Sequence, residues 1–111
     1  MSKYGAKKVT IDGITFDSIK EATRWRELKY HVMGKVITDL KRQEPYMLIP
    51  PQFDENGRLI ERAVYYVADF VYTDIKTGKT VVEDTKGVKT KDYIIKRKLM
   101  LERYGIRIRE V

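Results

Sequence analysis

Short β-prone runs separated by turn residues predict most elements of the chain. Val9–Ile11 and Ile14–Phe16 flank Asp12-Gly13, a dipeptide typical of two-residue hairpin turns. Pro50-Pro51 limits one later run to an edge or a bend of a sheet. The further strands that the pattern predicts are Tyr46–Phe53, Leu59–Tyr72, Thr80–Thr85 and Ile106–Val111, with a loop or short strand over residues 35–45.

Two segments are predicted to be helices, and each ends at a glycine. The first begins after Ser18, which has capping-box spacing with Glu21, and ends at about Gly34. The second spans about Thr90–Tyr104 and ends before Gly105. The element order predicts an α/β or α+β fold, in which a mixed β-sheet is packed against helices.

Length and composition narrow the class of protein. The chain has 111 residues, 42% of them hydrophobic, and we expect a single domain over residues 1–111. It has no Cys and one His, which excludes a disulfide scaffold, a Cys nucleophile and a multi-His metal site. No apolar run reaches the ~18 residues of a membrane span, and no signal peptide is recognisable. We therefore expect a cytoplasmic protein with no membrane partner.

The net charge of +7 is concentrated at the two ends of the chain. Residues 86–111 hold nine basic and three acidic side chains, and residues 1–11 hold three basic ones, whereas the middle is mildly acidic. Such a distribution favours a polyanionic partner, with a solvated charged face as the alternative. The basic residues expected to contact DNA are Lys7, Lys8, Lys91, Lys96, Arg97 and Lys98.

Two carboxylates and a lysine are predicted to converge on neighbouring strands. Asp84 and Lys86 are two residues apart, so in a strand they share a face, whereas Glu83 points the other way. If the turn around residues 76–78 closes a hairpin, Asp69 lies opposite position 84 or 86. Strand alternation also places Asp69 on one face with Tyr65, Val67 and Val71.

Glu21 is a third carboxylate in an unusual position. At about 100° per residue it falls inside the apolar arc that holds Ala22, Trp25 and Leu28, so it faces whatever the helix packs on. Each acidic residue also has a simpler interpretation. Glu21 could only complete the capping box, Asp84 and Lys86 could form an ordinary ion pair, and Asp69 could hold a turn or pair with Lys86. The aromatic residues Trp25, Tyr65, Tyr66 and Tyr93 are interpreted as core or groove residues.

The joint pattern suits Mg²⁺-dependent phosphodiester hydrolysis. Mg²⁺ prefers oxygen ligands and takes one or two carboxylates together with water and phosphate oxygens. It activates water and stabilises a leaving oxygen, and a neighbouring lysine can orient water or neutralise developing charge. Three carboxylates and Lys86 in one pocket of a basic chain provide these parts.

Three segments, in order, resemble the motifs of the PD-(D/E)xK nuclease superfamily. They are Phe16-Asp17-Ser18-x-x-Glu21-Ala22, Val67-Ala68-Asp69-Phe70 and Glu83-Asp84-Thr85-Lys86-Gly87. The resemblance covers most of the chain and is greatest to small phage- and prophage-encoded endonucleases similar to Holliday junction resolvases. Ala68 stands where the superfamily pattern often has proline.

The resemblance implies a restriction-endonuclease-like core, with a central mixed sheet flanked by two helices. It implies that Asp69 and Asp84 bind Mg²⁺, or Mn²⁺ in its place, and that the carbonyl of Thr85 is a further ligand. Lys86 would assist the nucleophilic water, and Glu21 would complete the site. Glu83 is an alternative ligand, but alternation favours Asp84 because it shares a face with Lys86.

These expectations define one leading function and two alternatives. The leading function is a metal-dependent DNA endonuclease that hydrolyses phosphodiester bonds and is specific for branched DNA in phage recombination or replication. Because two cuts resolve a four-way junction, that substrate would imply a two-fold homodimer. The alternatives are a non-catalytic DNA-binding or recombination accessory module, and a structural subunit in which the carboxylates form buried ion pairs.

Overall fold

The computed structural model describes residues 7–111, which form two compact units. The first comprises the described part of Met1–Lys41 together with Tyr72–Val81, and the second comprises Arg42–Val71 and Val82–Val111. The expectation of a single domain stays a prediction.

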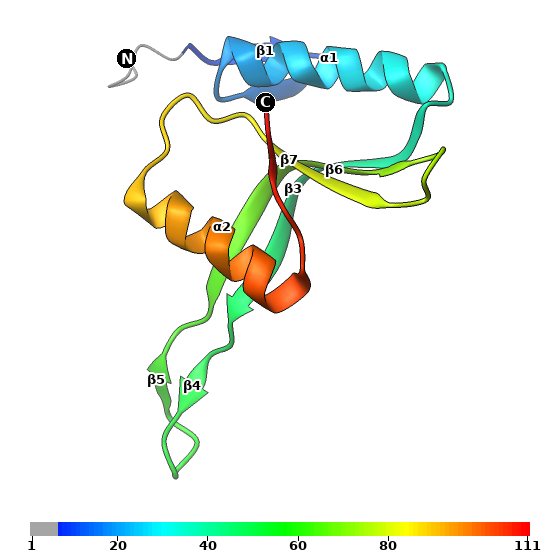
Figure 1. The fold of residues 1–111 in the computed structure, drawn as a ribbon. Coiled ribbons are helices and arrows are strands. Elements are labelled where there is room, and N and C mark those ends of the chain that lie inside the picture. Colours follow the sequence, from blue (N-terminus) through cyan, green and yellow to red (C-terminus); the bar gives the residue numbers. More distant parts are fainter. Residues whose placement is uncertain (1–6) are drawn as a thin grey trace. The chain divides into compact units, whose positions relative to one another are not determined.

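The fold is mixed α and β, as the sequence predicts (Figure 1). The helices are α1 (Ile19–Met33) and α2 (Lys91–Tyr104). A four-stranded mixed sheet has the order β3-β6-β7-β8, and the pairs β1-β2 and β4-β5 form small two-stranded sheets. The strands are β1 (Val9–Ile11), β2 (Ile14–Phe16), β3 (Ile37–Ile49), β4 (Gln52–Phe53), β5 (Leu59–Glu61), β6 (Val64–Asp74), β7 (Thr80–Asp84) and β8 (Arg109–Glu110).

In the first unit, the β1–β2 hairpin leads directly into α1. Asp12 and Gly13 both have positive φ, as a type I′ turn requires, which confirms the predicted hairpin. The Oγ of Ser18 accepts a hydrogen bond from the N–H of Glu21 at 3.1 Å, which confirms the predicted helix start. The ring of Phe16 lies 6.1 Å from that of Trp25, so hairpin and helix share an aromatic contact.

The end of α1 differs from the predicted capping geometry. Gly34 has a φ of −80°, and the left-handed conformation is adopted by Lys35, with a φ of 58°. The N–H of Lys35 donates to the carbonyl of Val32, and that of Val36 donates to the carbonyl of His31. These hydrogen bonds satisfy the last carbonyls of the helix. The left-handed residue that ends the helix is therefore Lys35, one position after the predicted Gly34.

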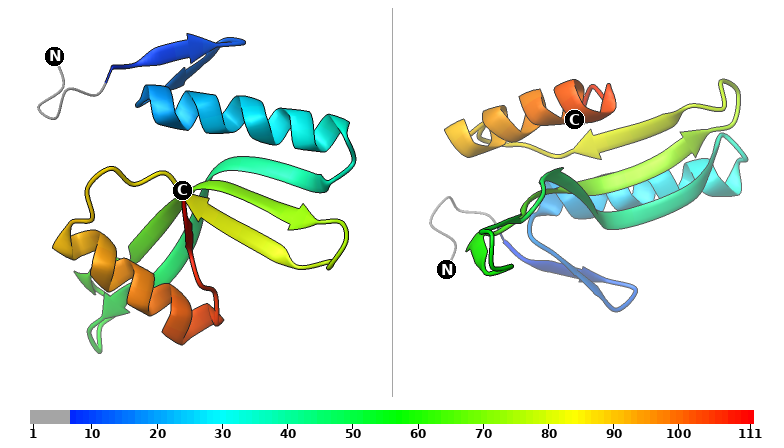
Figure 2. Two further views of the ribbon diagram at one scale, coloured as in Figure 1. Left: turned by 45° about the horizontal axis from the view of Figure 1, so that its top comes forward. Right: turned by 90° about the horizontal axis from the view of Figure 1, so that it is seen from below.

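In the second unit, α2 packs on one face of the sheet, as the right-hand view of Figure 2 shows. Thr90 caps its start by accepting from the N–H of Tyr93, and Gly105 ends it with a left-handed φ of 68°. The extent of the helix and its end at Gly105 confirm the prediction. The core beneath the helix consists of Leu48, Tyr66, Ala68, Val71, Val82, Tyr93 and Met100.

The central part of the chain contains the largest correction. Residues 35–45 are not a loop or a short strand, because β3 begins at Ile37 and extends to Ile49. Asp39 and Gln43 have positive φ within it, and each such residue interrupts the two-residue alternation from which strands are recognised. The strand also lies at the edge of the sheet, where polar side chains are common.

Two other predicted strands are shorter or interrupted. The run Leu59–Tyr72 divides into β5 and β6 at Arg62 and Ala63, and the last strand is reduced to β8. The turn at residues 55–58 is confirmed, because Oδ1 of Asp54 accepts from the N–H groups of Asn56 and Arg58, both at 2.9 Å. β8 runs parallel to β7 and pairs Glu110 with Asp84. This pairing brings the C-terminal residues beside the predicted site.

Within the described residues, neither helix is long and apolar enough to cross a membrane.

Candidate functional site

The predicted site lies at residues 64–71 of β6 and residues 82–86 at the end of β7, which belong to the second unit. The two strands form a hairpin, whose turn is closed by a 2.9 Å hydrogen bond from the N–H of Asp74 to the carbonyl of Lys79. This pairing is one of the registers expected from the sequence. It brings the middle of β6 level with the carboxyl end of β7.

The side chains of β6 change face near Asp69. Tyr66, Ala68 and Val71 all belong to the core beneath α2. Strict alternation from Tyr66 and Ala68 would instead place Phe70 in that core. The alternation therefore changes phase between Ala68 and Val71, as it does where a strand carries an extra, bulged residue.

The prediction that Asp69 lies on one regular face with Tyr65, Val67 and Val71 is accordingly wrong. Tyr65 and Val67 are half exposed, whereas Val71 is buried in the core. The predicted approach of Asp69 to the end of β7 is nevertheless confirmed. Its Oδ2 accepts two hydrogen bonds from Thr85, one from the N–H and one from the hydroxyl, both at 2.8 Å.

These two hydrogen bonds fix the orientation of the Asp69 carboxylate. Both use the same oxygen, Oδ2, and come from one residue, so the carboxylate cannot rotate without losing them. The other oxygen, Oδ1, lies at a longer 3.5 Å from the side-chain amide of Gln43. Oδ1 is therefore the oxygen of Asp69 that is less strongly held.

Asp84 is almost entirely buried, with 1% of its surface exposed. Its Oδ2 accepts a 2.6 Å hydrogen bond from the hydroxyl of Tyr66. Its Oδ1 is buried and has no hydrogen-bond partner, and the ammonium group of Lys86 lies 3.6 Å away. The side chains of Asp84 and Lys86 thus lie close together as predicted, although Lys86 follows the end of β7. One carboxylate oxygen of Asp84 is left without a hydrogen bond.

The surroundings of Asp84 perturb its titration. Burial raises the pKa of the Asp84 carboxyl to about 6, and repulsion from the Asp69 carboxylate adds to this. The hydrogen bond from Tyr66 and the charge of Lys86 act in the opposite direction. Because the charges of Asp69 and Asp84 repel each other, a cation bound between the two carboxylates would be stabilised.

Lys86 is held on its other side by an aromatic ring. Its ammonium group lies 4.8 Å from the centre of the Tyr93 ring, and 33% of its side chain is exposed. The Tyr93 hydroxyl donates a 2.6 Å hydrogen bond to Oε2 of Glu110. Burial raises the pKa of Tyr93, so the hydroxyl keeps its proton and remains a donor.

The Glu110 carboxylate, which accepts the hydrogen bond from Tyr93, also forms ion pairs with two basic residues. Its Oε2 also accepts from Arg97 at 3.1 Å, and its Oε1 pairs with Lys89 at 3.2 Å. The hydrogen bond from Tyr93, followed by those from Lys89 and Arg97, lowers the pKa of Glu110. The carboxylate is therefore ionised and holds the C-terminal strand against α2.

The six residues predicted to contact DNA do not form one cluster within the second unit, and two of them lie in the first unit. Lys96 lines a hollow of about 310 Å³ together with Lys86, between the two tyrosines and the start of α2. Arg97 and Lys98 line a second hollow, and Lys91 is exposed at the start of α2. Lys7 and Lys8 are exposed in the first unit. Of the six residues, Lys96 is the one that shares a hollow with the predicted catalytic lysine.

Glu21 lies in the first unit, on the buried side of α1, with 4% of its surface exposed. Its burial with Ala22, Trp25 and Leu28 confirms the predicted arc. Its backbone N–H completes the interaction with Ser18. Convergence of Glu21 with Asp69 and Asp84 stays a prediction.

The second unit contains two carboxylate oxygens that fit the ligand requirements of one Mg²⁺ ion. Among residues 7–111, no three His, Cys, Asp or Glu side chains form a ready-made cage. Mg²⁺ does not need one, since it keeps several waters and takes one or two carboxylates. The buried Oδ1 of Asp84, which lacks a hydrogen bond, and the weakly held Oδ1 of Asp69 fit that requirement.

Comparison with known proteins places the chain in a family. Residues 1–109 match the family model described as "Protein of unknown function (DUF1064)". The chain belongs to this family. No curated protein and no solved structure matches it.

In this DUF1064 chain, the sequence-based reasoning missed the partners that hold the site. Tyr66 and Tyr93 are core residues as interpreted, but each also donates its hydroxyl to a carboxylate. The signal was present in principle, because a buried tyrosine needs an acceptor for its hydroxyl. Glu110 had no such signal, since its position depends on the parallel pairing of β7 with β8.

Proposed function

We propose that this protein is a metal-dependent DNA endonuclease that hydrolyses phosphodiester bonds and belongs to the PD-(D/E)xK type. The observation that carries the proposal is the arrangement around Asp84. A buried carboxylate oxygen without a hydrogen bond lies 3.6 Å from a partly exposed lysine, beside a second carboxylate fixed by Thr85. An ion pair with no further role would leave that oxygen unexplained, because buried polar atoms are normally satisfied.

In this proposal Asp69 and Asp84 hold Mg²⁺, with the Thr85 carbonyl and Glu21 as candidate further ligands and Mn²⁺ as a substitute. When bound, the ion would polarise a phosphate oxygen and stabilise charge on the leaving oxygen. Tyr66 directs Asp84 by occupying Oδ2, so that Oδ1 faces Lys86.

Lys86 has the position expected of a group that orients an attacking water. Its ammonium group contacts both the Asp84 carboxylate and the Tyr93 ring, and a third of the side chain reaches solvent. An ammonium in this position can also neutralise negative charge that develops on the phosphate. Lys96, in the same hollow, supplies a second positive charge for a neighbouring phosphate.

The substrate proposed is DNA, with branched DNA as the preferred form and the cytoplasm of a bacterial host as the location. Junction cleavage would need two active sites related by a two-fold axis, and hence a homodimer. A monomer in sedimentation at micromolar concentration would contradict junction resolution but not phosphodiester hydrolysis.

A cleavage assay tests the proposal. Labelled four-way junction, linear duplex and single strand are incubated with Mg²⁺, Mn²⁺ or EDTA and with wild type, Asp84→Asn or Glu102→Gln. Glu102 is an exposed carboxylate of α2 and serves as the control for loss of one negative charge. We expect metal-dependent cutting by wild type and Glu102→Gln, and loss of at least about 100-fold in Asp84→Asn.

Two outcomes would contradict the proposal. Salt-sensitive DNA binding without cleavage under any metal would favour the accessory module. Equal cleavage by wild type and Asp84→Asn would place the chemistry elsewhere. Symmetric nicks confined to the junction would identify the preferred substrate as branched DNA.

A further inference from the structure

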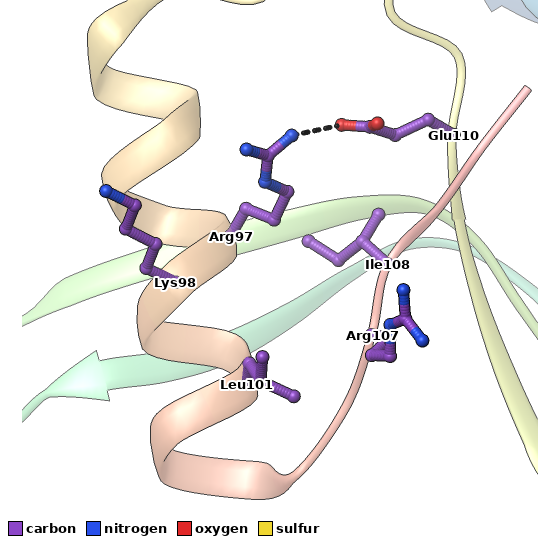
Figure 3. Close-up of a pocket in the computed structure, with 6 residues that line it drawn as sticks. All are labelled: Arg97, Lys98, Leu101, Arg107, Ile108 and Glu110. Atoms are coloured by element: carbon purple, nitrogen blue, oxygen red, sulfur yellow. Dashed lines mark hydrogen bonds and ion pairs between the residues drawn. The ribbon is translucent and has the colours of Figure 1, made fainter.

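A second hollow lies on another side of α2, between the helix and the C-terminal strand (Figure 3). Its volume is about 370 Å³. Three of its lining side chains are cationic, two are apolar and one is acidic. They are Arg97, Lys98, Leu101, Arg107, Ile108 and Glu110.

The acidic side chains that line this hollow do not balance its positive charge. Glu110 is its one acidic lining residue, and that carboxylate already accepts from Tyr93 and Arg97 and pairs with Lys89. Neither Lys98 nor Arg107 has an ion pair with any of the described residues. Two unpaired cations therefore flank an arginine whose guanidinium is already oriented.

Arg97 is the fixed element of the group. Its Nη1 donates to Glu110, and its guanidinium lies 5.9 Å from the centre of the Tyr93 ring. Figure 3 shows the side chain directed from α2 towards Glu110 across the hollow. A guanidinium held in this way still has further N–H groups and can bind an anion with little loss of conformational freedom.

The apolar lining narrows the class of anion. Leu101 is half exposed beside the three cations, and Ile108 contributes a second apolar side chain. A backbone phosphodiester presents charged oxygens next to an apolar deoxyribose, which matches cations beside exposed aliphatic groups. Inorganic phosphate would leave the aliphatic groups in water.

The position of the hollow suits a strand that continues from the catalytic site. Lys96 and Arg97 are consecutive on α2, and Lys96 lines the hollow of Lys86 whereas Arg97 lines this one. We propose that Arg97, Lys98 and Arg107 form a phosphate subsite that binds a DNA backbone phosphate away from the bond that is cut. The identification of DNA as the partner rests on the proposed function, whereas the binding of an anion at this subsite does not depend on it.

The salt dependence of DNA binding tests the subsite. The affinity of the catalytically inactive Asp84→Asn protein for duplex DNA is measured from low to moderate salt. The same measurement is made after Arg107→Gln or Arg103→Gln is added to the Asp84→Asn protein. Arg103 is a matched control, because it lies on α2 over the Tyr104 ring and does not line the hollow. We expect Arg107→Gln to reduce the slope of log affinity against log salt by about 0.9, and Arg103→Gln to leave it unchanged. Equal slopes for the two variants would overturn the subsite.

A titration with inorganic phosphate separates the source of the anion. The side-chain Nε–H signal of Arg97 is followed by NMR in wild type and Arg107→Gln. We expect weak binding in wild type that falls at least about tenfold in Arg107→Gln. A phosphate response with no change in the DNA salt slope would overturn the assignment to a DNA backbone and indicate a free phosphate compound.

The two proposals fail independently. If Arg107→Gln lowers the DNA salt slope but wild type never cleaves, the subsite stands and the nuclease does not. If wild type cleaves and Arg107→Gln binds DNA with the wild-type slope, the nuclease stands and the subsite does not.

Discussion

The hydroxyl of Tyr66 donates a 2.6 Å hydrogen bond to Oδ2 of Asp84, and Oδ1 of the same carboxylate is left without a hydrogen bond. The two residues are buried together beneath α2. Because burial raises the pKa of Tyr66, the hydroxyl remains a donor throughout the working pH range. The tyrosine thus determines which oxygen of Asp84 faces Lys86.

Tyr66→Phe is expected to weaken metal binding and to destabilise the fold. The substitution keeps the ring but leaves Oδ2 of a buried carboxylate without its donor, at a cost of about 1–3 kcal/mol. Loss of an orienting partner of this kind lowers metal affinity by about 10- to 100-fold. Calorimetric titration with Mn²⁺ and urea unfolding measure the two effects.

The matched control for this substitution is Tyr65→Phe. Tyr65 is the neighbouring tyrosine of β6, and 47% of its surface is exposed. It is expected to change neither stability nor Mn²⁺ affinity by more than a few tenths of a kcal/mol. Equal Mn²⁺ affinities for Tyr66→Phe and wild type would show that Tyr66 has only a packing role.

The raised pKa of Asp84 predicts a particular dependence of stability on pH. Its folded-state pKa is about 6, above the ordinary value of 3.8, so the folded protein holds this proton between these pH values and the unfolded chain releases it. The resulting stabilisation is present below about pH 4 and is lost as pH rises through 6. A shift of this size corresponds to at most about 3 kcal/mol.

Asp84→Asn should remove this dependence, because the amide does not titrate. We expect the variant and wild type to have similar unfolding free energies near pH 4, and the variant to be more stable by up to about 3 kcal/mol at pH 8. Urea unfolding at a series of pH values, without metal, measures the difference. A difference that is constant with pH would refute the raised pKa. A variant that is less stable at pH 8 would instead indicate a structural ion pair with Lys86.

The ring of Tyr93 is expected to matter for cleavage more than its hydroxyl does. Tyr93→Phe removes the hydrogen bond to Glu110 but keeps the ring beside the Lys86 ammonium group, whereas Tyr93→Leu removes both. An interaction of about 0.5–2 kcal/mol predicts that the leucine variant loses about 2- to 30-fold more in kcat than the phenylalanine variant. Single-turnover cleavage measures the comparison. If the two variants cleave equally, the ring does not position Lys86.

The local signals in the sequence were sufficient for the helices and for the first hairpin. Ser18 and Gly105 begin and end their helices as predicted, because a cap depends on residues within one turn of the helix. Asp12-Gly13 forms its turn for the same reason. Neighbouring residues alone determine these features.

The site needed information that local patterns do not contain. The phase change in β6 brings Val71 into the core with Tyr66 and Ala68, and regular two-residue alternation does not predict it. The contact of Tyr93 with Glu110 joins residues 17 positions apart through the parallel pairing of β7 and β8. The predicted pair of Asp84 and Lys86 was accessible because the two residues are only two positions apart in the sequence, although Lys86 follows the end of β7.

Thr85 provides a last test, because one residue donates two hydrogen bonds to Asp69. Thr85→Val preserves the shape of the side chain and the backbone N–H, and it removes the hydroxyl donor that lies 2.8 Å from Oδ2. With one donor left, the Asp69 carboxylate is less restrained, and we expect Mn²⁺ affinity to fall about tenfold with a stability loss of about 1 kcal/mol. Thr85→Ser keeps the hydroxyl and should retain most of the wild-type affinity. If valine and serine at this position give the same Mn²⁺ affinity, the hydroxyl of Thr85 does not orient Asp69 for metal binding.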